Sequence, residues 1–251
     1  MLYAVLLCAV ASLATGLGGV IVAVFKNFSQ RTLALSQGFA AGVMLGVSFM
    51  DMLPHSGTYV FSNMSFVRAA VYITVLFSVG WLISMLLARL VTPQQTDEDD
   101  TVMAARRLCF VTTAVVVLHN LPEGMLTSFS AFNSKEFGLH IAFAVAMHNI
   151  PEGIAVASSV MYVTASRAKA VWQSFMAGIA ELVGGVLALA VMYRFVTESF
   201  LMAMFVVIAG IMTQVSLCEL IPTGAKIYSV KTVLLGLICG VMIIALGMLM
   251  I

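Results

Sequence analysis

The sequence predicts an all-α integral membrane protein with eight transmembrane helices in one domain over residues 1–251. Hydrophobic residues make up 62% of the chain and charged residues 9%, whereas soluble domains carry about 25% charged residues. Apolar segments of about 20 residues recur, which is the length that an α-helix needs to cross a bilayer. Strand-like alternation of apolar and polar residues is absent from the sequence, so a membrane β-barrel is not expected.

Eight apolar segments account for the eight helices. The first has no Lys or Arg before its apolar core and is long enough to span, so we interpret it as a retained helix and not a cleaved signal peptide. The second and seventh end at Pro54 and Pro222, and the fourth and fifth contain Pro122 and Pro151. In chain order we expect helices at residues 2–25, 32–53, 67–90, 108–130, 137–162, 170–193, 200–221 and 232–251.

Basic residues are distributed unequally between the two sides of the predicted bundle. The first, third, fifth and seventh loops are flanked by Lys26, Arg31, Arg89, Arg106, Arg107, Arg167, Lys169, Lys226 and Lys231. The other side holds only Arg68, Lys135 and Arg194. The positive-inside rule therefore places the odd-numbered loops, including a flexible loop at residues 91–107, in the cytoplasm, and both termini outside. We expect a multi-pass protein of the cytoplasmic (inner) membrane.

A repeated segment links the second and seventh helices. Residues 41–44 and 48–54 match residues 209–212 and 216–222 at one constant offset. Because these two helices run in opposite directions, the repeat is inverted and relates helices 1–3 to helices 6–8, a plan that recurs in secondary transporters. It places Asp51 at the outer mouth and Glu219 at the inner mouth. The alternative is that two unrelated helices each end in an acid-x-x-Pro stop.

Two copies of one six-residue motif lie in the middle of the fourth and fifth helices. They are His119-Asn120-Leu121-Pro122-Glu123-Gly124 and His148-Asn149-Ile150-Pro151-Glu152-Gly153. In each copy the His and Glu are four residues apart, so both side chains lie on one face of a helix. Imidazole and carboxylate groups are costly in a hydrocarbon interior and mark a functional site there. A lone His would more often be a hydrogen-bonded structural group, but the doubled motif argues against that role.

The two motifs are expected to converge on a metal ion. A short loop joins their helices, which predicts antiparallel neighbours with both motifs at one depth. His119, Glu123, His148 and Glu152 would then supply two imidazoles and two carboxylates, a set that suits a borderline cation such as Zn²⁺.

Pro loosens each helix beside these ligands. Pro122 leaves the carbonyl of Leu118 without its helical donor, and Pro151 does the same to Met147. The freed carbonyls need polar partners, which water or a cation in a cavity can supply.

Further polar residues would surround a second ion. Glu181 lies near the middle of the sixth helix and would join Glu123 and Glu152 around that ion. Asn120 and Asn149 would contribute neutral oxygens. The residues alone leave open whether one ion or two are bound.

At these residues the chain resembles the ZIP family of divalent metal transporters, and within it the bacterial ZupT-like branch. The resemblance covers essentially the whole chain. It includes both HNxPEG motifs, GFAAGVML at residues 38–45, MLP at 52–54 and AELVGG at 180–185. Two features depart from the family pattern. The loop between the third and fourth helices carries acids at residues 97–100 in place of His residues, and His148-Asn149 stands where the binuclear pattern has Gln-Asp.

The resemblance implies a fold of three, two and three helices with pseudo-symmetric outer triplets. It implies uptake toward the cytoplasm, a homodimer and an elevator-like movement of one bundle against another. It also implies two metal sites. One would take His119, Glu123, His148 and Glu152 with Met44 nearby, and the other Asn120, Glu123, Asn149, Glu152 and Glu181. Met44 is either a soft ligand or apolar filling, as most Met residues here are.

These features predict uptake of Zn²⁺ as the transported substrate, with no resident cofactor. Imidazole ligands favour such ions over Ca²⁺ and Mg²⁺, which prefer oxygen, and Fe²⁺, Mn²⁺, Cd²⁺ and Co²⁺ are further candidates. We expect the ion to enter past Asp51, bind the central site and leave past Glu219. The acids at residues 97–100 form either a solvated loop or a weak cytoplasmic collecting site.

Two alternatives belong to other classes. A passive metal channel of the same fold would use the same ligands, and a saturating rate or proton countertransport would separate the two. A zinc protease would carry HExxH, with two His residues one turn apart, which neither motif contains, so an enzyme is not expected. The net charge of +1 gives no reason to expect a nucleic-acid partner.

Overall fold

The computed structural model describes residues 1–24, 29–90, 100–192 and 197–249. All regular structure in these ranges is helical, so the predicted all-α class is confirmed. Within the same ranges, eight helical runs are long and apolar enough to cross a membrane, as the sequence predicted.

Ten α-helices and three π-helical segments make up the described chain. The α-helices are α1 (Leu2–Val24), α2 (Gln30–Gly46), α3 (Leu53–Asn63), α4 (Phe66–Leu90), α5 (Asp100–Asn133), α6 (Lys135–Thr164), α7 (Arg167–Leu187), α8 (Glu198–Val215), α9 (Ile221–Ile227) and α10 (Val230–Met248). The π-helical segments are η1 (Val47–Met52), η2 (Ala188–Met192) and η3 (Ser216–Leu220).

The second and seventh spans continue past Pro54 and Pro222, where the sequence predicted that they would end. α2, η1 and α3 form one run over Gln30–Asn63, and α8, η3 and α9 form one run over Glu198–Ile227. Pro54 and Pro222 lie in the first turns of α3 and α9, directly after a π-helical segment. The wider π turn shifts the hydrogen-bond register, and a residue without an N–H is tolerated at the start of the next α-helical turn.

The fourth span begins earlier than expected. α5 starts at Asp100, whereas the sequence placed the helix start at residue 108. Arg106 and Arg107 therefore belong to the helix and not to a loop. A helix satisfies its own backbone hydrogen bonds, so it can extend beyond the apolar segment that crosses the membrane. Residues 91–99, which include most of the acidic cluster, lie outside the described ranges.

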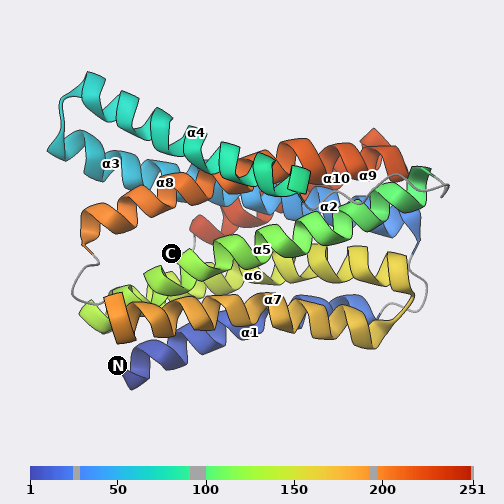
Figure 1. Ribbon diagram of the computed structural model, residues 1–251, viewed down its shortest axis with the longest axis horizontal. Coiled ribbons are helices and arrows are strands. Elements are labelled where there is room, and N and C mark those ends of the chain that lie inside the picture. Colours follow the sequence, from blue (N-terminus) through green and yellow to red (C-terminus); the bar gives the residue numbers. More distant parts are fainter. Residues whose placement is uncertain (25–28, 91–99, 193–196, 250–251) are drawn as a thin grey trace.

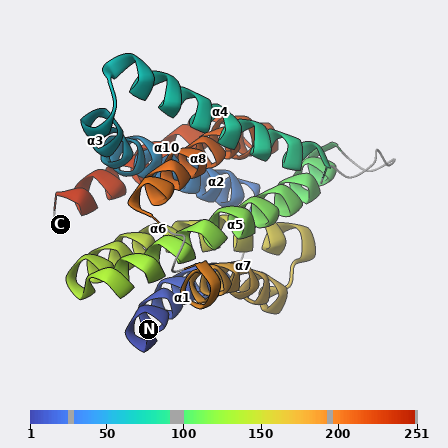
Figure 2. The same ribbon diagram turned by 60° about the vertical axis from the view of Figure 1, so that its left-hand side comes forward.

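The helices divide into two bundles (Figures 1 and 2). In the first, called the motif bundle, α1 and α5 both pack against α6 and α7. In the second, called the flanking bundle, α2 packs against α10 and α4 packs against α8. The bundles meet where α2 contacts α6 and where α5 contacts α8. This spatial grouping cuts across the expected chain-order division of three, two and three helices, since the first and sixth spans join the central pair.

The outer faces of the flanking bundle are apolar. α4 buries only Ala69, Gly80, Ser84 and Ala88 among its 25 residues. Its large apolar side chains, such as Val71 and Leu86, are exposed. An apolar exterior of this extent suits contact with lipid chains and not with water.

Two glycines allow the helices of the motif bundle to approach closely. A Cβ at Gly153 of α6 would collide with the backbone oxygen of Thr15 on α1. A Cβ at Gly124 of α5 would collide in the same way with the backbone oxygen of Glu181 on α7. Close backbone approach through small residues is a main source of helix association in membranes, so both positions fix the spacing around the motifs.

Gly153→Ala is expected to destabilise the protein. Overpacking of a tight contact costs about 1–3 kcal/mol, which lowers the melting temperature of a chain of this size by roughly 2–12 °C. Thermal unfolding in detergent measures the effect. Gly247→Ala is the matched control, because nothing lies within 4 Å of its Cβ position, and it should unfold at or above the temperature of the unmodified protein. Equal melting temperatures for the two variants would contradict the packing role.

Candidate metal centre

The paired motifs lie at the middle of α5 and α6, which pack against each other. Both helices run without interruption through Pro122 and Pro151. His119, Glu123 and Glu152 are fully buried and His148 is 3% exposed. Four potentially charged side chains are therefore held in the interior, where each needs a partner.

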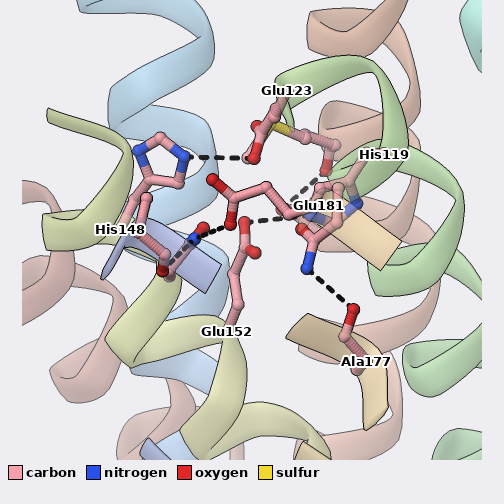
Figure 3. Close-up of polar contacts among 11 residues, drawn as sticks. His119, Glu123, His148, Glu152, Ala177 and Glu181 are labelled. Carbon is pink, nitrogen blue, oxygen red and sulfur yellow. Dashed lines mark hydrogen bonds and ion pairs between the residues drawn. The ribbon is translucent and has the colours of Figure 1, made fainter. Parts of the chain in front are cut away.

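The two motifs face each other crosswise. Nε2 of His119 lies 3.0 Å from Oε1 of Glu152, and Nε2 of His148 lies 3.4 Å from Oε2 of Glu123. Each imidazole thus meets the carboxylate of the other helix, and Figure 3 shows these side chains directed toward a shared space. The sequence placed His and Glu on one face of each helix, and the structure brings the two faces together.

Three of these residues form a compact set of ligand atoms. One nitrogen of His119 and one oxygen each of Glu123 and Glu152 lie within 4.8 Å of one another. Two atoms bound to one tetrahedral zinc ion at bond lengths of about 2.0–2.2 Å lie roughly 3.3–3.6 Å apart, which is within this limit. His148 adjoins the set through Glu123.

Many polar atoms here have no hydrogen-bond partner among the described residues. They include both ring nitrogens of His119, both carboxylate oxygens of Glu152 and one oxygen of Glu123. The 3.0 Å approach of His119 to Glu152 is therefore close without the alignment of a hydrogen bond. An unsatisfied buried polar group costs about 1–3 kcal/mol, and a cation between these atoms would satisfy several at once.

The two asparagines are held by backbone carbonyls of neighbouring helices. Nδ2 of Asn120 donates to the carbonyl of Ala177 on α7 at 3.2 Å, and Nδ2 of Asn149 donates to that of Ala11 on α1 at 2.9 Å. Both Oδ1 atoms are buried without a partner. The amides are thus oriented with their oxygens free to act as neutral ligands. These anchors could not be predicted from the sequence, because a backbone carbonyl has no side-chain signature.

Glu181 joins the same network from α7. It is fully buried, and its Oε2 accepts a hydrogen bond of 2.6 Å from Nδ2 of Asn149. Its other oxygen, Oε1, has no partner among the described residues. α5, α6 and α7 therefore each direct a carboxylate toward the centre (Figure 3).

The three residues predicted on other helices lie outside this network. Met44 is fully buried on α2 within the hydrophobic core, a position compatible with apolar filling. Asp51 on η1 is exposed and lines a cavity of about 50 Å³ that His148 also lines. Glu219 on η3 is nearly buried and pairs with Arg107 at 3.0 Å. That partner was not foreseen, since the sequence indicated only that Arg107 flanks a loop.

Comparisons with known proteins agree with this chemistry. A family model described as ZIP Zinc transporter matches residues 91–248. The Zinc transporter ZupT of Chlorobium phaeovibrioides is 35% identical over 258 residues, which cover 98% of this chain and 97% of the relative. The Zinc transporter ZupT of Escherichia fergusonii is 34% identical over 249 residues, covering 97% of this chain and 95% of the relative. The Zinc transporter ZupT of Streptococcus mutans is 32% identical over 256 residues, covering 98% and 97%.

Metal binding to this centre is expected to weaken in acid. An imidazole nitrogen must be deprotonated to ligate a metal, and imidazole in water titrates near pH 6.5. Below that pH the affinity should fall by about tenfold per pH unit for each proton that the metal displaces. Calorimetric titration with Zn²⁺ between pH 7 and about pH 5 measures the change.

His140→Ala is the control for this titration. His140 is exposed and its ring contacts only the carbonyl of Glu136 among the interactions seen, so its loss should leave the pH dependence intact. A flat affinity across this pH range in the unmodified protein would exclude imidazole ligands.

Proposed function

Because this chain belongs to the ZIP zinc transporter family, we propose that it takes up Zn²⁺ into the cytoplasm through the His/Glu centre of the motif bundle. The family is one of transporters and not of enzymes, and the chain is a multi-pass membrane protein. The observation that carries the proposal is the crosswise approach of two imidazoles and two carboxylates in the buried middle of the protein.

The first ion would be held by His119, Glu123, His148 and Glu152. The short separations among their ligand atoms and the lack of other partners for them support this set. Carboxylates offset the loss of hydration that a divalent ion suffers on leaving water. Imidazole nitrogens favour Zn²⁺, and also Fe²⁺, Mn²⁺, Cd²⁺ and Co²⁺, over Ca²⁺ and Mg²⁺. Met44 would be a soft neighbour to this ion.

A second ion would be held by Asn120, Glu123, Asn149, Glu152 and Glu181. The free Oδ1 atoms of both asparagines and the free Oε1 of Glu181 support this assignment. Two of the five ligands are neutral amides, so this site carries less negative charge than one built from acids alone. Occupancy of the second site would therefore be weaker than that of the first.

The helices before and after the central pair would form an inverted repeat. Support comes from two matching pairs of contacts that the central helices make with α1 and with α7. In both pairs the α7 residue follows its α1 counterpart by the same number of positions in the sequence. The paired contacts are Asn149 with Ala11 and Asn120 with Ala177, and then Gly153 with Thr15 and Gly124 with Glu181. The π-helical segments η1 and η3 also fall in the two copies of the repeated segment.

An elevator-like movement is favoured by the distribution of the ligands. Apart from Met44, every proposed metal ligand lies on α5, α6 or α7, and so on the motif bundle. The pathway residues Asp51 and Glu219 both lie on the flanking bundle. A motif bundle that slides along the flanking bundle could therefore carry a complete coordination shell from one mouth to the other, with no exchange of its carboxylate and imidazole ligands on the way.

Entry past Asp51 and exit past Glu219 are supported by the difference between the two mouths. The cavity beside Asp51 reaches His148, whereas Glu219 is covered by Arg107. Access from one side only is what alternating access requires, and a passive channel would need both mouths open at once. By the positive-inside rule, the basic residues on the Glu219 side favour a cytoplasmic position for that mouth, and both termini would then lie outside.

Assembly as a homodimer is part of the same proposal. It comes from the family resemblance, and the broad apolar faces of α4 and α10 offer surface for it. Light scattering with subtraction of the detergent mass would give the number of chains per particle.

Glu152→Ala is expected to abolish uptake, because it removes a carboxylate that both proposed ions share. Loss of a group that only supports a metal ligand already lowers metal affinity or activity by about 10–100-fold, so loss of a ligand itself should cost at least as much. Uptake of radioactive Zn²⁺ into cells that express equal amounts of each variant measures the loss. Glu136→Gln on the same helix is the control, since that residue is exposed at the start of α6. Undiminished uptake by Glu152→Ala would refute the central site.

A further inference from the structure

An ion pair joins the two bundles at a distance from the metal centre. Nη2 of Arg107 on α5 donates a hydrogen bond of 3.0 Å to Oε1 of Glu219 on η3. The Glu219 side chain is 7% exposed and that of Arg107 is 40% exposed. A nearly buried carboxylate is costly unless a cation accompanies it, and the guanidinium of Arg107 is that cation here.

The pair bridges the interface that an elevator-like movement would shear. Arg107 belongs to the motif bundle and Glu219 to the flanking bundle, and α5 contacts η3 and α9 in the same region. Arg107 lies about 18 Å from His119 along the axis of α5, at a rise of about 1.5 Å per residue. The pair is therefore too far from the centre to act as a ligand there, but it lies at the mouth through which the ion is proposed to leave.

The corresponding acid at the other mouth is in a different state. Asp51 occupies the position of Glu219 in the other copy of the repeated segment. It is exposed and shares a cavity with His148. Asp51 is thus exposed beside a cavity that reaches His148, whereas Glu219 is nearly buried and forms an ion pair with Arg107.

The chemistry of the pair suits a barrier to cations. Arginine keeps its charge at any physiological pH, so the pair cannot be broken by deprotonation of Arg107. A movement of the helices must separate the two side chains. While the pair is formed, the guanidinium repels an approaching divalent ion, and one oxygen of Glu219 is unavailable to it. η3 is π-helical, and π-helical turns often mark functional positions where a helix adjusts.

We propose that Arg107 and Glu219 form the gate of the mouth that is closed in this structure. The proposal rests on the transport function argued above. When α5 moves relative to η3, the pair separates, the charge of Arg107 withdraws, and the freed carboxylate of Glu219 binds the departing ion. The ion replaces the guanidinium as the partner of that carboxylate, so the carboxylate is left without a cation only briefly.

Thr112 provides a reporter between the gate and the centre. It is fully buried on α5, and its hydroxyl has no partner among the described residues. It precedes His119 by about two helical turns and shares its face of the helix. In a chain whose Cys8, Cys109, Cys218 and Cys239 are replaced by Ser, Thr112→Cys would carry the single thiol. A cationic, membrane-impermeant methanethiosulfonate would be added to inside-out membrane vesicles, which expose the cytoplasmic face.

Labelling is expected to be slow when the gate is intact and about tenfold faster in Arg107→Gln and in Glu219→Gln. It should be slow again when Arg107→Glu and Glu219→Arg are combined, because the swapped charges restore the pair. Electrostatic attraction of the reagent alone would speed labelling in Arg107→Gln and slow it in Glu219→Gln. Acceleration in both variants therefore identifies a gate. Lys169→Gln, which removes an exposed cation on the same side, is the control and should label slowly.

Two outcomes would overturn the gate: equal labelling rates in the starting protein and both single variants, or a swapped variant that labels as fast as they do. Melting temperatures of all variants check that each is folded. The same vesicles carrying Glu152→Ala separate this proposal from the transport function, because that substitution should remove uptake and leave labelling slow. If the starting protein moves no Zn²⁺ but the labelling pattern holds, the transport proposal fails, and the pair stands only as a barrier that closes this mouth to cations.

Discussion

The structure depends on the mutual neutralisation of groups that could not be buried singly. A carboxylate in a low-dielectric interior is tolerated only with a cation or several donors beside it. In the centre of this protein each carboxylate of one motif is met by an imidazole of the other, His119 with Glu152 and His148 with Glu123. Neither α5 nor α6 could hold its motif at this depth alone, so the pairing of the two helices and the existence of the site are one requirement.

The surrounding helices serve this requirement through backbone contacts. The side-chain amides of Asn120 and Asn149 donate to backbone carbonyls of α7 and α1, and their oxygens remain without a hydrogen-bond partner among the described residues. These anchors work only if α1 and α7 lie very close to the central pair, and Gly124 and Gly153 permit that approach. The glycine that ends each motif therefore belongs to the site as much as the His and Glu do, because it brings close the helices whose carbonyls hold the two amides.

The sequence predicted the parts of this arrangement that follow from local spacing. Helix period placed His119 with Glu123 and His148 with Glu152, and a short loop between the spans made them neighbours. The predicted helix ends were wrong at Pro54 and Pro222, because a π-helical turn before each Pro lets the helix continue. The sequence placed α7 beside the motifs through Glu181, but it did not foresee that Arg107 pairs with Glu219 or that α1 packs against the motifs. These are tertiary contacts between segments far apart in the chain, and composition and period contain no information about them.

Departures from symmetry give the proposed repeat its direction. Contacts of the motif bundle recur in pairs, yet Thr15 stands where the second copy has Glu181, and the hydroxyl of Thr15 is buried without a partner among the described residues. At the mouths, Asp51 is exposed while Glu219 is held by Arg107. If the two halves were identical, the conformations open to one side and to the other would have equal free energy, and neither would be preferred. The extra carboxylate on α7 and the extra cation on α5 remove that equivalence, and the cation does so at the mouth that we propose as the exit.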